Sequence, residues 1–360
     1  MRTVLLDQAS AADLDQIANK VAHTRRIAVV CGAGISCSAG IPDFRSKDGL
    51  YNLVKKEHPN AVVKGQDLFS CSLFQSSETT RIFYTFMAKL RAEMNAAGPT
   101  PTHHFFRRLQ DRKQLVRVYT QNIDGYESRV GLSGDKTVML HGDIHTLRCT
   151  TCKRERDWNS QCHDLLTTGV APLCLQCVEL AALREAEGKR QRSIGILRPA
   201  VVLYGEEHPE GDTIGTIAAK DAKAGPELLL ILGTSLKVDG IKHLVRDLAK
   251  AVHARKGLVV FINATPVSQS FWGPIIDFHV QGAVDHWVAD LRVRRPDIWQ
   301  TQTRLTNQIV PNKVVKQRSP TKLKDLRDAL EKDLRPIPLF GVFQVQPQPC
   351  MDHQLTRVEW

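Results

Sequence analysis

Short runs of apolar residues recur along the chain, and stretches with a helical pattern lie between them. The runs cover residues 27–31, 115–119, 201–203, 228–232 and 258–262. An unbroken apolar run of this kind is typical of a strand that is buried on both faces, as in a parallel sheet. The chain therefore alternates predicted strands with predicted helices up to about residue 290.

Two stretches show the helical pattern clearly. Ser10 stands where a helix cap is expected, with Asp13 three residues on in the capping-box position. The apolar residues that follow share one helical face: Leu14, Ile17, Ala18 and Val21. A second face joins Ile82, Phe83, Phe86, Met87 and Leu90. Strands that alternate with helices predict an α/β fold with a doubly wound, Rossmann-like parallel sheet.

A segment with paired cysteines interrupts this alternation. Cys149-x-x-Cys152 and Cys174-x-x-Cys177 form two pairs that 21 residues separate. Two such pairs are typical of a zinc ion with four thiolate ligands, which leaves no position for substrate and makes the metal structural. Cys162 is a weak substitute ligand, and reduced, unliganded cysteines are the alternative. We expect residues 149–197 to form a small zinc-binding module inserted into the α/β domain.

The strand and helix alternation ends near residue 291. Residues 292–360 form a tail with thirteen Lys and Arg against seven Asp and Glu. One helix is expected there, with a stripe formed by Leu323, Leu326, Leu330 and Leu334. Such a stripe more often docks on its own domain than on a partner. We therefore expect one catalytic domain over residues 1–291 and a basic tail after it.

Composition narrows the class of protein. The 360 residues are 42% hydrophobic and 24% charged, which suits a globular protein with a sizeable core. No apolar run approaches the roughly 20 residues that cross a bilayer, and the first residues resemble neither a secretory signal nor a transit peptide. The net charge of +11 favours polyanionic surroundings such as chromatin, although a solvated tail without a partner explains part of it equally well.

Polar clusters follow several of the predicted strands. Gly32-Ala33-Gly34-Ile35-Ser36 comes directly after the first run, and such glycines let a backbone approach a pyrophosphate. That loop alone also fits a tight turn, since Cys37 replaces the third glycine of a dinucleotide fingerprint. The other clusters are Thr120-Gln121-Asn122-Ile123-Asp124, His141-Gly142, Gly233-Thr234-Ser235-Leu236 and Asn263. Ligands of open α/β sheets bind at this strand edge, so the clusters predict one shared site.

At these residues the chain resembles the sirtuin family, over about Ile27 to Asp290. The glycine loop continues as Ser38-Ala39-Gly40-Ile41-Pro42-Asp43-Phe44-Arg45, and the cysteine pairs complete the resemblance. Segments 140–149 and 198–206 are most similar to the fungal nuclear branch that acts on core histones. Cys37, Asp239 and the pair Ala283-Val284 depart from the family pattern, for which we expect modest changes in cofactor affinity.

The resemblance implies NAD as cofactor and a set of residues that bind it. These are Gly32, Ala33, Gly34, Ser36, Asp43, Phe44, Arg45, Gln121, Asn122, Ile123, Asp124, Gly233, Thr234, Ser235, Asn263 and Val284. By resemblance, the first glycine loop and Arg45 contact phosphate and ribose, and Phe44 shields the nicotinamide side. Asn122 and Asp124 line the nicotinamide pocket, and the loop from Gly233 with Asn263 holds the adenosine end.

The resemblance also implies the activity. His141 and Asn122 are the implied catalytic residues, with His141 as general base, a task that suits a side chain with a pKa near 6.5. The implied products are free lysine, nicotinamide and O-acetyl-ADP-ribose. A mono-ADP-ribosyltransferase and an NAD-sensing chromatin scaffold are the alternatives. His103, His104 and His145 are expected to be structural.

Substrate and location follow from the same resemblance. The implied partners are acetylated protein lysines, above all those of core histones, and the implied location is the nucleus, with the cytoplasm as alternative. Residues 61–69 contain neither the Tyr nor the Arg that sirtuins use for acidic acyl groups, which favours a neutral acyl group. The oligomeric state stays open.

Overall fold

The computed structural model describes residues 1–43, 49–58 and 65–300. Met1–Thr301 form one compact unit. The helix predicted in the tail lies outside the described residues, as do Phe44 and Arg45.

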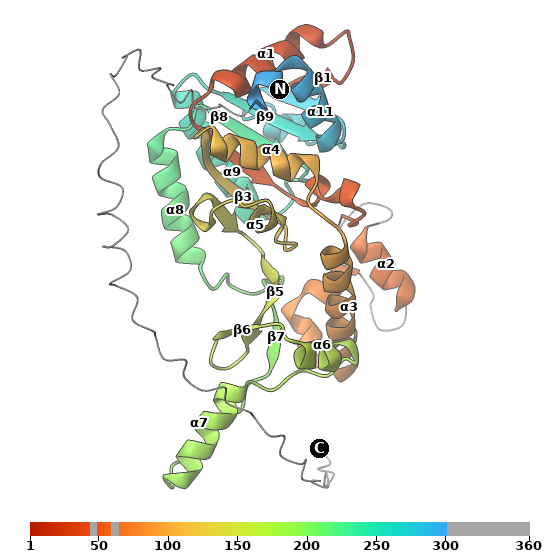
Figure 1. Ribbon diagram of the computed structural model, residues 1–360, viewed down its shortest axis with the longest axis vertical. Coiled ribbons are helices and arrows are strands. Elements are labelled where there is room, and N and C mark those ends of the chain that lie inside the picture. The colour runs from red at the N-terminus through yellow and green to blue at the C-terminus, as the bar shows by residue number, and fades with distance from the viewer. Residues whose placement is uncertain (44–48, 59–64, 301–360) are drawn as a thin grey trace, which may run out of the picture. The chain divides into compact units, whose positions relative to one another are not determined.

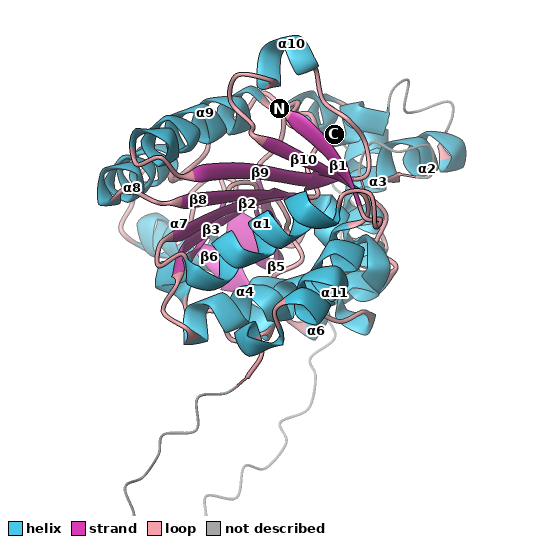
Figure 2. Ribbon diagram, turned by 90° about the horizontal axis from the view of Figure 1, so that it is seen from above, coloured by secondary structure: helices cyan, strands magenta, loops and turns pink. Residues whose placement is uncertain are grey.

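A seven-stranded sheet forms the larger part of this unit, and every neighbouring pair of its strands is parallel. In spatial order the strands are β1 (Arg2–Leu5), β10 (Phe278–Gln281), β9 (Leu258–Asn263), β8 (Leu228–Leu232), β2 (Ile27–Cys31), β3 (Leu115–Thr120) and β4 (Thr137–Met139). Helices cover both faces (Figure 2). The predicted fold class, an α/β fold with a doubly wound parallel sheet, is confirmed.

Burial on both faces explains why these strands are unbroken apolar runs. Alternate side chains of a strand point to opposite faces. Val29 packs into a core that includes residues of α1 (Ala11–His23), α4 (Pro101–Asp111) and α11 (Val284–Arg294), whereas Val30 packs into a second core with α9 (Asp239–Ala254). The helix α8 (Gly211–Ala224) lies beside α9 on that second face (Figure 2). A polar side chain at either position would be buried in apolar surroundings.

The helix α1 begins after Ser10, but the predicted capping box is wrong. The Ser10 hydroxyl accepts the backbone N–H of Leu5 (3.1 Å) instead of a helix N–H. Asp13 forms an ion pair with Arg2 (2.9 Å). Both side chains are drawn to β1 because that strand lies beside the start of the helix (Figure 1).

A second lobe is formed by segments before β3 and after β4, and it has a core of its own. Its three-stranded sheet pairs β5 (Gly142–Cys149) antiparallel with β6 (Glu155–Asp157) and with β7 (Leu197–Val201). Around it lie α2 (Leu50–Glu57), α3 (Ser77–Ala96), α6 (Ser160–Thr167) and α7 (Leu175–Ala186), as Figure 1 shows. The small sheet therefore reaches beyond residues 149–197 at both ends.

One predicted strand belongs to this lobe and not to the large sheet. The apolar run 201–203 was expected as a buried parallel strand, but Val201 ends the antiparallel strand β7, and residues 202–203 lie beyond it. A run of three residues is too short to tell a parallel strand from the end of an antiparallel one.

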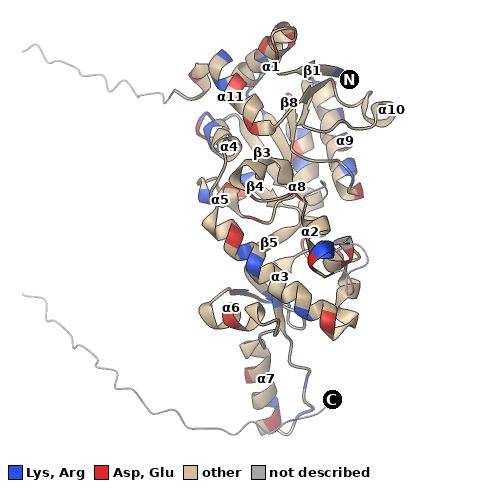
Figure 3. Cartoon of the chain, turned by 90° about the vertical axis from the view of Figure 1, so that its right-hand side faces the viewer, with Lys and Arg blue, Asp and Glu red and all other residues tan. Residues whose placement is uncertain are grey.

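Two short helices, α5 (Tyr126–Arg129) and α10 (Gln269–Trp272), complete the described elements of the α type. No helix in the described part of the chain is long and apolar enough to cross a membrane. Figure 3 shows that α2 and α9 each carry both basic and acidic side chains, so on these two helices the positive charge is not segregated.

Candidate functional site

The site lies where the direction of strand order reverses. The chain runs from β2 to β3 on one side, and from β8 to β9 on the other, while β2 and β8 are neighbours. The loops that follow β2 and β8 therefore diverge and leave a crevice at the carboxyl edge of the sheet.

Glycines allow these two loops to touch. The Gly34 N–H donates to the Gly233 carbonyl (2.9 Å), and Gly233 has a positive φ of 61°. A Cβ on Gly34 would lie 2.7 Å from Gly233 Cα, closer than two non-bonded carbon atoms approach in proteins. Any other residue at Gly34 would push the loops apart and change the floor of the crevice.

A cavity of about 550 Å³ opens above this contact. Most of the predicted site residues line it, and they come from separate parts of the chain. The loops after β2 and β8 contribute Gly32, Ala33, Gly34, Gly233, Thr234 and Ser235. The other predicted residues on its wall are Asp43, Gln121, Ile123, His141, Asn263 and Val284.

Three predicted residues are buried beneath the cavity instead of lining it. The Ser36 hydroxyl donates to Asp124 Oδ2 (2.7 Å), and Asn122 Nδ2 donates to Ser36 Oγ (3.1 Å). Each of the three side chains is less than 5% exposed. Among the described residues, Asn122 Oδ1 has no hydrogen-bond partner, which is costly for a buried acceptor.

His141 occupies the cavity wall in a defined tautomer. Its Nδ1 lies 2.9 Å from the Gln121 carbonyl, and a carbonyl only accepts, so Nδ1 carries the proton. In the neutral ring the lone pair therefore resides on Nε2. The backbone carbonyl of His141 accepts the N–H of Val202 (2.9 Å), which joins this residue to the chain that leaves β7.

Two buried carboxyl groups lie behind this wall. Burial, and next the charge of Asp124, raise the pKa of Glu127 to about 7. Burial also raises the pKa of Asp124, although the Ser36 hydroxyl and the Tyr126 N–H act against it. Because two neighbouring buried carboxylates repel each other, the charge of Asp124 disfavours ionisation of Glu127.

Two of the three histidines expected to be structural, His103 and His145, are held by local contacts. His103 is fully buried, burial lowers its pKa to about 3, and its Nδ1 accepts the Thr100 N–H at the start of α4. His145 Nε2 lies 2.8 Å from the Asp124 carbonyl and so supports the loop that carries Asp124. His104 is exposed on α4.

Some residues of the cavity wall were missed by the sequence analysis. Tyr51, Phe69, Leu203 and Tyr204 line it from the second lobe. The apolar run 201–203 was assigned to the large sheet, and segment 198–206 was noted only for its similarity to the fungal branch. Nothing in the sequence placed Tyr51 near that run, since 153 residues separate it from Tyr204.

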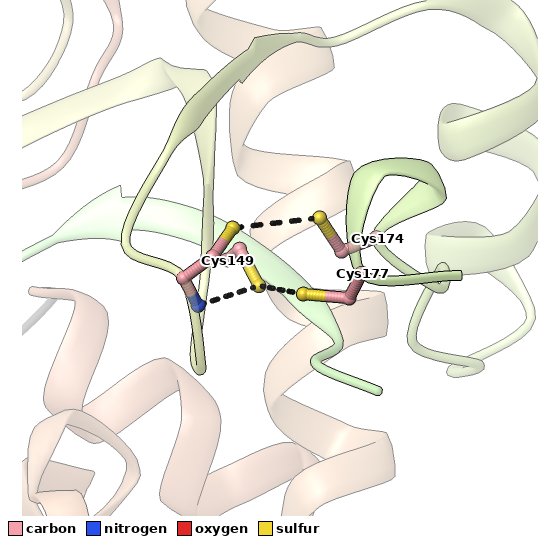
Figure 4. A group of neighbouring side chains, drawn as sticks. Cys149, Cys174 and Cys177 are labelled. Carbon is pink, nitrogen blue, oxygen red and sulfur yellow. Dashed lines mark hydrogen bonds between the residues drawn. The ribbon is translucent and has the colours of Figure 1, made fainter. Parts of the chain in front are cut away.

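The four paired cysteines converge as expected. Their sulfur atoms all lie within 4.8 Å of one another, with Cys149–Cys177 and Cys152–Cys174 each at 3.7 Å. Figure 4 shows the side chains pointing toward a common centre. A tetrahedral ion with Zn–S bonds of about 2.3 Å needs sulfur separations of about 3.8 Å, so the cluster fits zinc. Cys162 is not part of the group.

The surroundings of the cluster suit thiolates. The backbone N–H groups of Thr151 and Cys152 both point at Cys149 Sγ (3.4 Å each). Gly195 lies so close that a Cβ there would be 2.4 Å from the same sulfur. Four ligands from the chain close the coordination sphere, so the cluster is suited to a structural ion and not to a catalytic one.

Comparisons with known proteins agree with this geometry. The model of the Sir2 family matches residues 32–240. The NAD-dependent histone deacetylase HST3 of Candida albicans is 41% identical over 323 residues, which cover 84% of this chain and 66% of that protein. HST3 of Saccharomyces cerevisiae is 42% identical over 313 residues, which cover 81% of this chain and 70% of that protein. The chain thus spans about two thirds of the length of these curated relatives.

Solved structures show the same fold. A Sir2 enzyme, solved to explain the mechanism and regulation of these enzymes, superposes with a TM-score of 0.59 and 26% identity. The match covers 80% of this chain and 99% of the Sir2 chain. A Sir2 homologue in complex with 2′-O-acetyl ADP ribose superposes with a TM-score of 0.60 and 23% identity. The match covers 80% of this chain and 98% of the homologue.

Proposed function

Because this chain belongs to the Sir2 family, we propose that it is an NAD-dependent protein deacetylase that acts on core histones. One observation carries the proposal. His141, with its lone pair on Nε2, lines the same cavity as the glycine loops at the carboxyl ends of β2 and β8. A nucleotide site and a proton acceptor thus open onto one space.

Each part of the chain has a distinct role in this proposal. NAD, when bound, supplies the ADP-ribosyl group that accepts the acetyl group from lysine. The contact of Gly34 with Gly233 keeps the crevice floor free of side chains, so the backbone can approach the phosphates. Thr234 and Gln121 are joined by a hydrogen bond (2.9 Å), which fixes the two strand-end loops relative to each other.

Asn122 suits the nicotinamide end. Within the described part of the chain its Oδ1 has no partner, while its Nδ2 donates to Ser36 Oγ. A carboxamide N–H would satisfy that oxygen, and its departure would leave it unsatisfied again. The buried hydrogen bonds of Ser36 and Asp124 keep Asn122 in one orientation.

His141 acts as general base through Nε2. The bond from Nδ1–H to the Gln121 carbonyl fixes the ring and stabilises the positive charge that forms when Nε2 takes a proton. General bases of this kind contribute typically about 10²–10⁴-fold to a rate. The zinc cluster takes no part in the chemistry, since its four ligands all come from the chain.

Core histones as substrate and the nucleus as location rest on the names of the relatives and on charge. HST3 of both yeasts is a histone deacetylase by name, and this chain has a net charge of +11. Histones are basic and would be repelled, so attraction to chromatin must act through DNA phosphate and weaken as salt rises. We propose residues 1–291 as the catalytic domain, with residues 149–197 inserted as the zinc-binding module, called the cysteine module below.

Product analysis tests the activity. The purified chain is incubated with NAD and acetylated histones, and every product is identified by mass. Deacetylated lysine, nicotinamide and O-acetyl-ADP-ribose in equal amounts support the proposal. ADP-ribose attached to protein would instead show a mono-ADP-ribosyltransferase, and no turnover of NAD would leave only a binding protein.

Acetylation in cells tests the substrate and the location. The gene is deleted, and acetylation of bulk core histones is compared with that of soluble cytoplasmic proteins. A rise on histones is expected. A rise confined to cytoplasmic proteins would refute the chromatin assignment while leaving the chemistry intact.

A further inference from the structure

Two tyrosine hydroxyl groups face each other on the part of the cavity wall that the second lobe forms. Tyr51 in α2 and Tyr204 after β7 both line the cavity, and their oxygen atoms lie 3.2 Å apart. The neighbouring wall residues from the same lobe are apolar: Phe69, Val201, Val202 and Leu203. Nothing in the proposed handling of NAD uses these two hydroxyl groups.

The backbone of Tyr204 and the ring of Tyr51 are held in place. The Tyr204 N–H donates to the Phe69 carbonyl (2.7 Å), and the Cys71 N–H donates to the Tyr204 carbonyl (2.9 Å). The Tyr51 ring packs on Phe69 with centroids 5.4 Å apart. A phenol fixed in this way loses little conformational entropy when it binds a partner.

This wall lies next to the proposed reacting centre. The Val202 N–H donates to the His141 carbonyl, and Tyr204 is two residues further along the same segment. An acetyl group that reacts beside His141 is short. A longer acyl chain must extend from that point along a wall, and the segment 201–204 provides an apolar one that ends in the two hydroxyl groups.

We propose that Tyr51 and Tyr204 make the enzyme prefer acyl groups with a hydroxyl on their chain over apolar acyl groups of the same length. The inference rests on the deacylase function proposed above and names its substrate class. A hydroxyl such as that of 3-hydroxybutyryl both donates and accepts, so it can join the pair. A butyryl chain removes water from the two phenols and returns no hydrogen bond, which costs binding.

The test compares three peptides that differ only in the acyl group on one lysine: acetyl, butyryl and 3-hydroxybutyryl. The ratio of kcat/KM for 3-hydroxybutyryl to that for butyryl is measured with NAD. We expect a ratio of about 3–10 in the wild type, because a neutral hydrogen bond contributes roughly that factor. Tyr204→Phe and Tyr51→Phe should each lower the ratio toward one.

Tyr84→Phe is the matched control. Tyr84 is a fully buried tyrosine of α3 that does not line the cavity, and its substitution should leave the ratio as in the wild type. A ratio of one or less in the wild type, or a ratio that neither cavity variant changes, would overturn the inference. If the wild type removes acetyl but shows no such selectivity, only this inference fails. If it removes none of the three groups, the proposed function fails as well.

Discussion

The seven-stranded sheet and the cysteine module are stabilised in different ways. All five residues of β8 are completely buried, and helices cover both faces of the sheet. The twelve-residue helix α7 buries only Cys177, while Leu175, Leu180 and Leu183 are 68%, 46% and 61% exposed. The sheet spreads its stability over many apolar contacts, whereas the part of the module around α7 concentrates it in four sulfur atoms.

This contrast says where single changes matter. Removing one methyl group from the sheet core costs about 1 kcal/mol, because the rest of the core remains. Removing one sulfur ligand disrupts the entire cluster. The floor of the site belongs to the sheet, and its opposite wall belongs to the apolar core of the second lobe.

The largest effect is expected at the cysteine cluster. Cys149→Ser or Cys174→Ser should abolish zinc binding and give insoluble protein, because structural zinc contributes about 10–16 kcal/mol in small modules, comparable with the stability of a domain. Elemental analysis should find one zinc per chain in the wild type. Cys162→Ser, outside the cluster, should keep the zinc. Active protein with no zinc would refute the structural role.

At the sheet edge, His141→Ala should reduce deacetylation by about 10²–10⁴-fold while the fold stays intact. Asn122→Ala should also lose activity, because the orphan acceptor is removed. His104→Ala serves as control, since this histidine is exposed on α4. Circular dichroism and kcat/KM are measured together, and near-normal turnover in folded His141→Ala protein would exclude the role as base.

Glu127 makes the stability of the sheet edge depend on pH. Its pKa is raised to about 7 by burial and by Asp124, so the folded state holds a proton that the unfolded state releases above about pH 4.3. This contribution is fully present below pH 4.3 and is lost as pH rises to 7, on the order of 3 kcal/mol in total.

Glu127→Gln removes the pH-dependent contribution of this side chain to stability, because the amide does not titrate. Urea unfolding of both proteins is measured from pH 4 to 8. The wild type should lose stability relative to the variant as pH rises through this range. A difference between the two that stays constant with pH would show that the pKa of Glu127 is ordinary.

The smallest effects are expected at two glycines. Gly34→Ala places a Cβ 2.7 Å from Gly233 Cα and should cost about 1–3 kcal/mol, with weaker NAD binding. Gly215→Ala in α8 meets open space and should stabilise by about 0.5–1 kcal/mol. Thermal unfolding measures the change in stability of both variants, and NAD titration measures the change in their affinity for NAD. Equal effects at the two positions would show that the loop contact does not matter.

The sequence predicted the central strands β2, β3, β8 and β9 of the large sheet because each is a mainly apolar run, whereas the short strands β1 and β10 were not predicted. The runs 228–232 and 258–262 are unbroken and apolar, and the structure has β8 and β9 there. The glycine loops followed from those strands, since the carboxyl ends of parallel strands meet at one edge. The zinc site was predicted from the spacing of the cysteine pairs alone, which does not depend on knowing the fold.

The rest depended on distant contacts that no local pattern records. Ser10 has the right spacing for a cap, yet its hydroxyl bonds to Leu5 because β1 lies close by. Tyr51 reaches the cavity only because α2 packs near Phe69, and Phe69 pairs with Tyr204. The side of the cavity formed by the second lobe was therefore not foreseen, while the side formed by the sheet was.

The pairing of β2 with β8 has a consequence for synthesis on the ribosome. β2 leaves the exit tunnel early, but its neighbour β8 is translated only after the whole cysteine module. The four cysteines can therefore capture zinc while the centre of the sheet is still unpaired. Strand pairing over such a separation is slow and leaves apolar edges exposed, so we expect nascent chains that end before residue 228 to need chaperones.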